Sequence, residues 1–192
     1  RPTVTTAAIL VLTSDRGLAG AFNSNAQRAA ERRMQELQEQ GAEVKLFTIG
    51  RKGRDYFRRK GVEPAQDYTG SYDKPEKRAP EIARAIMDEF EAGTLDLVEV
   101  VYTEFKSAIT QKIRTDQLLP VKLEAEAPAA SAGERGLAVR DEAAAGHAAG
   151  PKADFIYEPD KAALLDRLLP MYVEVSVMRA MLDSLASEHG SR

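Results

Sequence analysis

The first half of the chain alternates short apolar runs with segments that have helical character. The apolar runs have the length and the unbroken hydrophobicity of strands that are buried on both faces. They span residues 7–13, 44–49 and 97–103. The predicted helices, each followed by a glycine, span residues 24–40, 52–60 and 80–92. Because strands alternate with helices, we expect an α/β fold, namely a Rossmann-like domain of three layers with a mostly parallel sheet.

The end of this region leaves the arrangement of the sheet open. A further strand is predicted at 110–119, where Pro120 ends it. This strand follows the one at 97–103 closely enough to form an antiparallel hairpin instead of a parallel pair. We also expect a polar loop at 64–73 and a helix that has Pro80 in its first turn.

Residues 124–152 have a different composition from the rest of the chain. They consist mainly of Ala, Gly, Glu and Pro, and Leu137 and Val139 are their only large apolar residues. Such a stretch cannot bury enough surface to offset the entropy lost on ordering. We therefore expect a mobile loop at 124–152 that separates an α/β domain at 1–123 from a last segment at 153–192.

The last segment carries a heptad pattern. Its apolar residues recur at alternating intervals of four and three, which is the spacing of a coiled-coil seam. The seam consists of Leu164, Leu168, Met171, Val175, Met178, Leu182 and Leu185. We expect a long helix whose seam needs a partner strand that this chain does not obviously supply. Pro170 lies inside the segment, where we expect a kink or a break.

Composition limits the chemistry that the chain can carry. The 192 residues include no cysteine, which excludes disulfides, thiolate metal sites and catalytic thiols. The two histidines, His147 and His189, supply little for metal or triad chemistry. A formal net charge of −3 argues against a dedicated nucleic-acid binder. No apolar run approaches the roughly 18 residues that a membrane-spanning helix needs.

The turn that follows the first strand is the place where an α/β domain would hold a ligand. Gly17 and Gly20, within Ser14 to Asn23, could let backbone amides approach a phosphate. Their spacing is neither that of a dinucleotide fingerprint nor that of a P-loop. A structural turn in which Asp15 pairs with Arg16 is the favoured interpretation, and a nucleotide-binding enzyme is kept as the alternative.

A basic run from Arg51 to Lys60 surrounds Tyr56 and Phe57, which is compatible with binding single-stranded nucleic acid or an acidic surface. We favour a short helix whose two aromatic residues pack on the sheet while its charges are solvated. Other candidate chemistry is weaker still. His189 continues the heptad spacing, which indicates packing, and the acids at 88, 89 and 91 look like a solvated helix face. We therefore assign no catalytic residue, no cofactor and no metal.

Two stretches resemble the gamma subunit family of F-type ATP synthases. One is SDRGLAGAFNSN, from Ser14 to Asn25, and the other runs from Phe155 to Arg192 with its EPD, LL-x-x-LL and ASEH elements. Supporting matches occur in the same order at 49–61 (IGRKGRDYFRRKG) and 101–111 (VYTEFKSAITQ). The resemblance covers nearly the whole chain outside the alanine-rich stretch.

The resemblance implies a non-catalytic rotor subunit. In the family, two helices form an antiparallel coiled coil inside a ring of alpha and beta subunits, and the α/β domain contacts the epsilon subunit and the c-ring. Rotation of the c-ring, driven by protons, then cycles the catalytic beta subunits. The family segment that faces the c-ring and epsilon matches Phe155, Tyr157 and Glu158, and the shaft matches the helix from Leu164 onward.

The resemblance also carries expectations about location and completeness. It implies peripheral attachment to a membrane through the complex. The alanine-rich and arginine-leaning composition favours a bacterial source, for which we expect the cytoplasmic side of the plasma (inner) membrane. Compared with the family, we expect this chain to lack the first shaft helix and to hold only the part of the last helix that ends just after ASEHGSR. Because the chain also begins with Arg1, we expect it to be a segment of a longer polypeptide.

Overall fold

The computed structural model describes residues 4–17, 20–121 and 150–191, and in the last range it describes side chains at 163 and from 167 onward. The chain forms two compact units. One consists of Arg1–Pro120 together with Tyr172–Arg192, and the other of Val121–Met171. The loop expected at 124–152 lies outside the described residues, apart from the backbone of 150–152, which is helical.

The first unit is built on a five-stranded sheet of order β3-β2-β1-β4-β5. Its strands are β1 (Thr6–Leu12), β2 (Glu43–Ile49), β3 (Gln66–Asp67), β4 (Leu97–Phe105) and β5 (Gln111–Leu119). β1 pairs in parallel with β2 and β4, and β2 pairs in parallel with β3. β5 runs antiparallel to β4. The mostly parallel sheet is therefore confirmed, and the last two strands form the hairpin.

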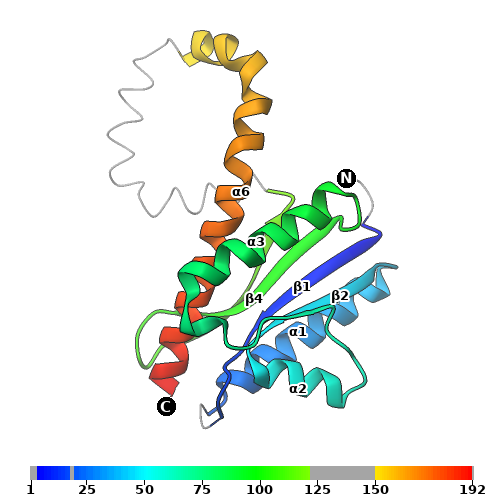
Figure 1. Ribbon diagram of the computed structural model, residues 1–192, viewed down its shortest axis with the longest axis vertical. Coiled ribbons are helices and arrows are strands. Elements are labelled where there is room, and N and C mark those ends of the chain that lie inside the picture. Colours follow the sequence, from blue (N-terminus) through cyan, green and yellow to red (C-terminus); the bar gives the residue numbers. More distant parts are fainter. Residues whose placement is uncertain (1–3, 18–19, 122–149, 192) are drawn as a thin grey trace. The chain divides into compact units, whose positions relative to one another are not determined.

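Helices cover both faces of this sheet. They are α1 (Phe22–Glu39), α2 (Arg51–Arg59), α3 (Pro75–Glu91) and the long α6 (Gly150–Ser191), with a short 3-10 turn, η1 (Ser71–Asp73). α1 and α2 lie on one face and α3 on the other (Figure 1). Residues 7–12 of β1 are all at most 1% exposed, as expected for a central strand with helices on both sides. The three-layer arrangement is confirmed.

The core beneath α1 follows from the spacing of its apolar residues. Ala26, Ala30, Met34 and Leu37 form one helical stripe, which packs against Ile9 and Val11 of β1. An ion pair fastens the same helix to β4, where Arg33 Nε lies 2.7 Å from Glu99 Oε1. This pairing, mainly the hydrogen bond with Glu99, raises the pKa of Arg33.

Two boundaries differ from the sequence predictions. α3 begins at Pro75, five residues before Pro80, which lies inside the helix. Both prolines suit a first helical turn, and only the earlier one occupies it. The stretch expected to be a polar loop at 64–73 contains β3 and η1, which are too short to leave an apolar pattern in the sequence.

The predicted break at Pro170 is wrong, because α6 runs without interruption from Gly150 to Ser191. Pro170 is exposed. An exposed position lets water replace the backbone hydrogen bond that proline cannot donate. Among the described residues, no helix combines the length and the apolar character that crossing a membrane requires.

Candidate functional site

The part of α6 that belongs to the first unit has an inner stripe of buried residues. Small side chains dominate this stripe, which allows the helix to approach the sheet closely. It consists of Val173, Val177, Ala180, Met181, Ser184 and Ser187. Two hydrogen bonds fix its last turns: Ser187 Oγ donates to the carbonyl of Thr103 at 3.3 Å, and Ser191 Oγ donates to Gln111 Oε1 at 2.9 Å. The inner stripe therefore holds α6 to β4 and β5.

An outer stripe of apolar residues lies on roughly the opposite side of the same helix. Val175 is 56% exposed and Leu182 is 48% exposed. Val175 is two residues from both Val173 and Val177, and each residue turns a helix by about 100°. The outer stripe consists of the predicted seam residues Val175, Met178, Leu182 and Leu185, of which Met178 and Leu185 are half-buried.

Other residues of the predicted seam belong to the second unit. There Leu168 is 45% exposed and Met171 is 60% exposed. The side chain of Leu164 lies outside the described residues. Single exposed apolar residues are ordinary, but a continuous apolar row on one helix marks an interaction surface. The outer stripe is therefore the candidate site.

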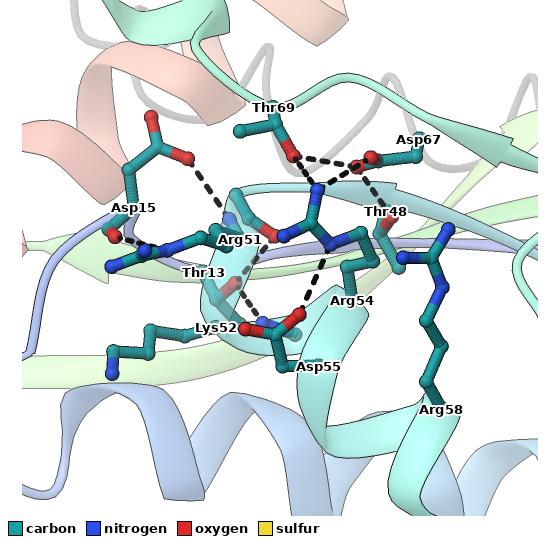
Figure 2. Close-up of polar contacts among 12 residues, drawn as sticks. Thr13, Asp15, Thr48, Arg51, Lys52, Arg54, Asp55, Arg58, Asp67 and Thr69 are labelled. Carbon is teal, nitrogen blue, oxygen red and sulfur yellow. Dashed lines mark hydrogen bonds and ion pairs between the residues drawn. The ribbon is translucent and has the colours of Figure 1, made fainter.

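A second conspicuous region is the joint between the end of β1 and the start of α2 (Figure 2). The hydroxyl of Thr13 accepts a hydrogen bond from the backbone N–H of Gly53 at 2.8 Å. The carboxylate of Asp15 accepts one from the N–H of Arg51 at 2.9 Å and another from Gly70 at 3.2 Å. These bonds satisfy N–H groups that a helix start leaves without partners. The joint is structural, and the predicted pairing of Asp15 with Arg16 is replaced by these contacts.

The glycine turn is closed by its own hydrogen bonds. Asn23 Oδ1 accepts from both the N–H of Ser14, at 2.9 Å, and its hydroxyl, at 3.1 Å. The Ser14 hydroxyl also contacts the carbonyl of Arg16. Gly17 and Gly20 are described, whereas residues 18 and 19 lie outside the described residues. The geometry therefore favours a structural turn over a nucleotide site.

Comparison with known proteins assigns the family. A family model described as ATP synthase matches residues 1–192, and the curated relatives of the chain are ATP synthase gamma chains. This chain belongs to the ATP synthase gamma-chain family. The gamma chain of Sorangium cellulosum is 46% identical over 186 residues, which are 96% of this chain and 54% of that one. The gamma chain of Anaeromyxobacter sp. (strain Fw109-5) is 42% identical over 188 residues, 97% of this chain and 58% of the relative.

Solved structures show the same fold. The chain matches a structure of the central stalk and c-ring of Tetrahymena thermophila mitochondrial ATP synthase with a TM-score of 0.65 and 21% identity, covering 100% of this chain and 75% of that one. A rotor structure of Euglena gracilis mitochondrial ATP synthase matches with a TM-score of 0.61 and 16% identity, covering 98% and 64%. The chain spans little more than half the length of the gamma chains of S. cellulosum and Anaeromyxobacter.

Within this gamma-chain family member, several basic residues of α2 and Lys60 just after it form ion pairs. Arg54 contacts Asp55 at 3.1 Å and Asp67 at 3.2 Å, as Figure 2 shows. Both acids raise the pKa of Arg54, and Asp55 contributes most. Arg58 pairs with Glu63 at 2.9 Å, and Lys60 pairs with Glu31 at 2.8 Å. Phe57 is 1% exposed and belongs to the core, so α2 is a packed helix, and ion pairs hold part of its charge.

The remaining predicted residues fall in different places. Phe155, Tyr157 and Glu158 belong to α6, but their side chains lie outside the described residues. His147 also lies outside them. His189 is exposed and lines a cavity of about 380 Å³ near Asp15. In the described part of the chain, no group of three or more His, Asp or Glu side chains is arranged to hold a metal.

Sequence reasoning missed the inner stripe of α6. The serines and the alanine of the inner stripe do not form a recognisable apolar pattern in the sequence, although they recur at helical spacing. The available signal was their small size, because small residues at intervals of three and four mark the side on which a helix approaches its neighbour most closely.

Proposed function

We propose that the chain is the part of an ATP synthase gamma subunit that joins the α/β domain to the lower shaft, and that it acts as a rotor without a catalytic site of its own. The observation that carries this proposal is the outer stripe of α6. A member of the gamma-chain family presents an apolar heptad row on the side of α6 that faces away from its own sheet. Such a row suits a second helix in a coiled coil.

The two stripes of α6 have two different roles in this proposal. The inner stripe, with Val173 and Val177 fully buried, anchors the helix on the sheet. The outer stripe, with Val175 and Leu182, is left for the second shaft helix. A torque applied to the α/β domain would then pass into the shaft through packed side chains, without a flexible link at this point.

The proposed partners follow from the family. We assign the shaft to the ring of alpha and beta subunits, and the foot of the domain to the epsilon subunit and the c-ring. Phe155, Tyr157 and Glu158 are the proposed contacts to the c-ring and epsilon. Rotation of the c-ring would drive the beta subunits through their nucleotide-binding states.

The location and the domain limits are proposals of the same kind. We propose peripheral attachment to the cytoplasmic side of a bacterial plasma membrane, which the bacterial relatives support. We also propose an α/β domain at 1–123, a loop at 124–152 and the lower shaft at 153–192.

Affinity purification of the full-length protein from detergent-solubilised membranes tests this proposal. We expect two larger subunits and ATP hydrolysis activity in the eluate. Val175→Asp should abolish this recovery, because it places a charge in the seam, whereas Arg179→Asp places the same charge at an exposed polar position of α6. A full-length protein recovered alone from the soluble fraction would contradict the proposal.

Calorimetry on the chain separates the rotor from the nucleotide-binding enzyme. The rotor proposal predicts no tight, stoichiometric binding of ATP or NAD, because the turn at Ser14 is closed by Asn23. Tight binding that is lost in Asn23→Ala would contradict a purely mechanical role.

A further inference from the structure

A small cavity lies at the carboxyl edge of the sheet, between the start of α1 and the end of β4. β1 and β4 are neighbours there, and the chain continues from β1 to β2 on one side and from β4 to β5 on the other. Open α/β sheets place their ligand crevices at such a switch point. The cavity measures about 210 Å³, and its lining includes Ala21, Phe22, Asn25, Thr103, Gln111 and Ser191.

The first feature of this cavity is the start of α1. The first N–H groups of a helix have no acceptor within the helix, and they carry the positive end of its dipole. No side chain caps α1, and no acidic residue lies in its first turn, although the helix has 18 residues. Ala21 and Phe22, where the helix begins, line the cavity.

The second feature is independent of the helix. Thr103 lines the cavity and is only 4% exposed, yet its hydroxyl oxygen has no hydrogen-bond partner in the part of the chain that the structure describes. A buried hydroxyl without a partner is costly and rare in folded proteins. It therefore points to a ligand or a bound solvent molecule at this place.

The described lining of the cavity carries no charged side chain and, besides its polar groups, includes Ile109 and Ile113. No carboxylate in this lining would therefore repel an anion. Arg28 donates from Nη2 to Asn25 Oδ1 at 3.1 Å, which holds a guanidinium beside the lining. We propose that the cavity binds a small oxoanion of the size of inorganic phosphate, held by the N–H groups that begin α1, by Thr103 and by the charge of Arg28.

The volume of the cavity suits a small ligand better than a nucleotide. Pockets for drug-sized ligands measure about 300–1,000 Å³, which is more than this cavity offers. The hydrogen bond from Ser191 to Gln111 joins two lining residues and brings the last turn of α6 against the crevice. This site adjoins the glycine turn, because both use the start of α1, but it takes a small oxoanion there instead of a nucleotide. It is independent of the rotor proposal.

The test is a titration of the isotopically labelled chain with sodium phosphate, followed by NMR, against sodium chloride of equal ionic strength. We expect saturable shifts of the backbone amides of Phe22, Asn23 and Ser24 with phosphate only. ADP should bind no more tightly than phosphate. No saturable shift, or shifts of equal size with chloride, would overturn the proposal, and so would binding of ADP without binding of phosphate.

Two variants locate the site. Thr103→Val keeps the shape of the side chain and should weaken phosphate binding about tenfold, because it removes one hydrogen bond to a charged ligand. Thr5→Val, at an exposed threonine, is the matched control and should bind as the original chain does. Asn25→Asp changes an exposed residue, so it should fold normally and still weaken binding by repulsion. Unchanged affinity in Thr103→Val or in Asn25→Asp would overturn the assignment.

Discussion

At the scale of single residues, Gly50 passes close to the backbone of Thr13. Gly50 has a φ of 106°, and a Cβ placed on it would lie 2.1 Å from the carbonyl oxygen of Thr13. This contact joins the end of β1 to the start of α2. The close packing of the strand and the helix is possible only because Gly50 has no side chain.

We predict that Gly50→Ala lowers the free energy of unfolding by about 3 kcal/mol or more, because a strained φ and a clash with backbone act together. Gly41→Ala is the matched control. Gly41 has a φ of 94° but no atom within 4 Å of its would-be Cβ, so only the strain applies and the loss should be about 1 kcal/mol. Urea denaturation measures the free energy of unfolding of both variants. Equal losses of stability in the two variants would contradict the close contact between Gly50 and Thr13.

Asp183 of α6 makes a second residue-scale prediction. Burial, and then the charge of Glu104, raise the pKa of Asp183 above its ordinary value of 3.8, while Arg179 opposes them. A raised pKa means that the folded state holds this proton more tightly than the unfolded state does. The ionised carboxylate therefore destabilises the fold at neutral pH, and the penalty disappears as pH falls below the ordinary pKa.

We predict that Asp183→Asn raises the melting temperature at pH 7 and that the gain shrinks as the pH approaches 4. Asp88→Asn, which changes an exposed acid of α3, is the control and should leave the melting temperature nearly unchanged. A gain that stays constant from pH 7 to pH 4 would show that removal of the charge is not its cause.

At the scale of elements, α6 is a helix with two different apolar sides. This division explains why its hydrophobic residues occur all around it, which is unusual for a helix that packs on only one neighbour. Val175 and Val177 offer a comparison within one helix turn, since the first is 56% exposed and the second is fully buried.

We predict that Val177→Asp destabilises the chain by about 3 kcal/mol or more, because it buries an unpaired charge. Val175→Asp should change stability by no more than about 0.5 kcal/mol, as surface substitutions usually do. Thermal or chemical denaturation of the chain checks both values. If Val175→Asp proves as damaging as Val177→Asp, the outer stripe is covered within the chain itself.

The sequence predicted those elements whose neighbours are close in the chain or whose pattern is strong. The central strand β1 and the helix α1 were recognisable because their apolar residues are continuous or periodic. The hairpin of β4 and β5 remained open, because apolar pattern alone does not encode strand direction. β3 has two residues and no pattern of its own.

The candidate site was predictable only in part. The heptad spacing singled out the residues of the outer stripe, which are exposed or half-buried in the structure. Their need of a partner helix stays a prediction. The inner stripe was not predicted, because Ser184 and Ser187 count as polar although they are fully buried. The hydrogen-bond partners of Asp15 could not be predicted either, because Arg51 and Gly70 lie 36 and 55 residues away in the sequence.

At the scale of the whole molecule, the chain spans little more than half the length of the gamma chains of S. cellulosum and Anaeromyxobacter. Its α/β domain gives a rigid base in which α1, α2 and α3 enclose the sheet. The last turns of α6 are fixed to this base by Ser187 and Ser191. In the proposed rotor, coupling would depend on whether the outer stripe of α6 engages a second helix.

The most direct measurement is ATP-driven proton pumping, relative to ATP hydrolysis, in membrane vesicles that carry the full-length protein with Val175→Asp. The account predicts that the substitution abolishes pumping, because the shaft no longer assembles around the outer stripe. Arg179→Asp should pump as the unsubstituted protein does. Normal pumping by Val175→Asp would contradict the account, because the exposed seam would then have no part in coupling.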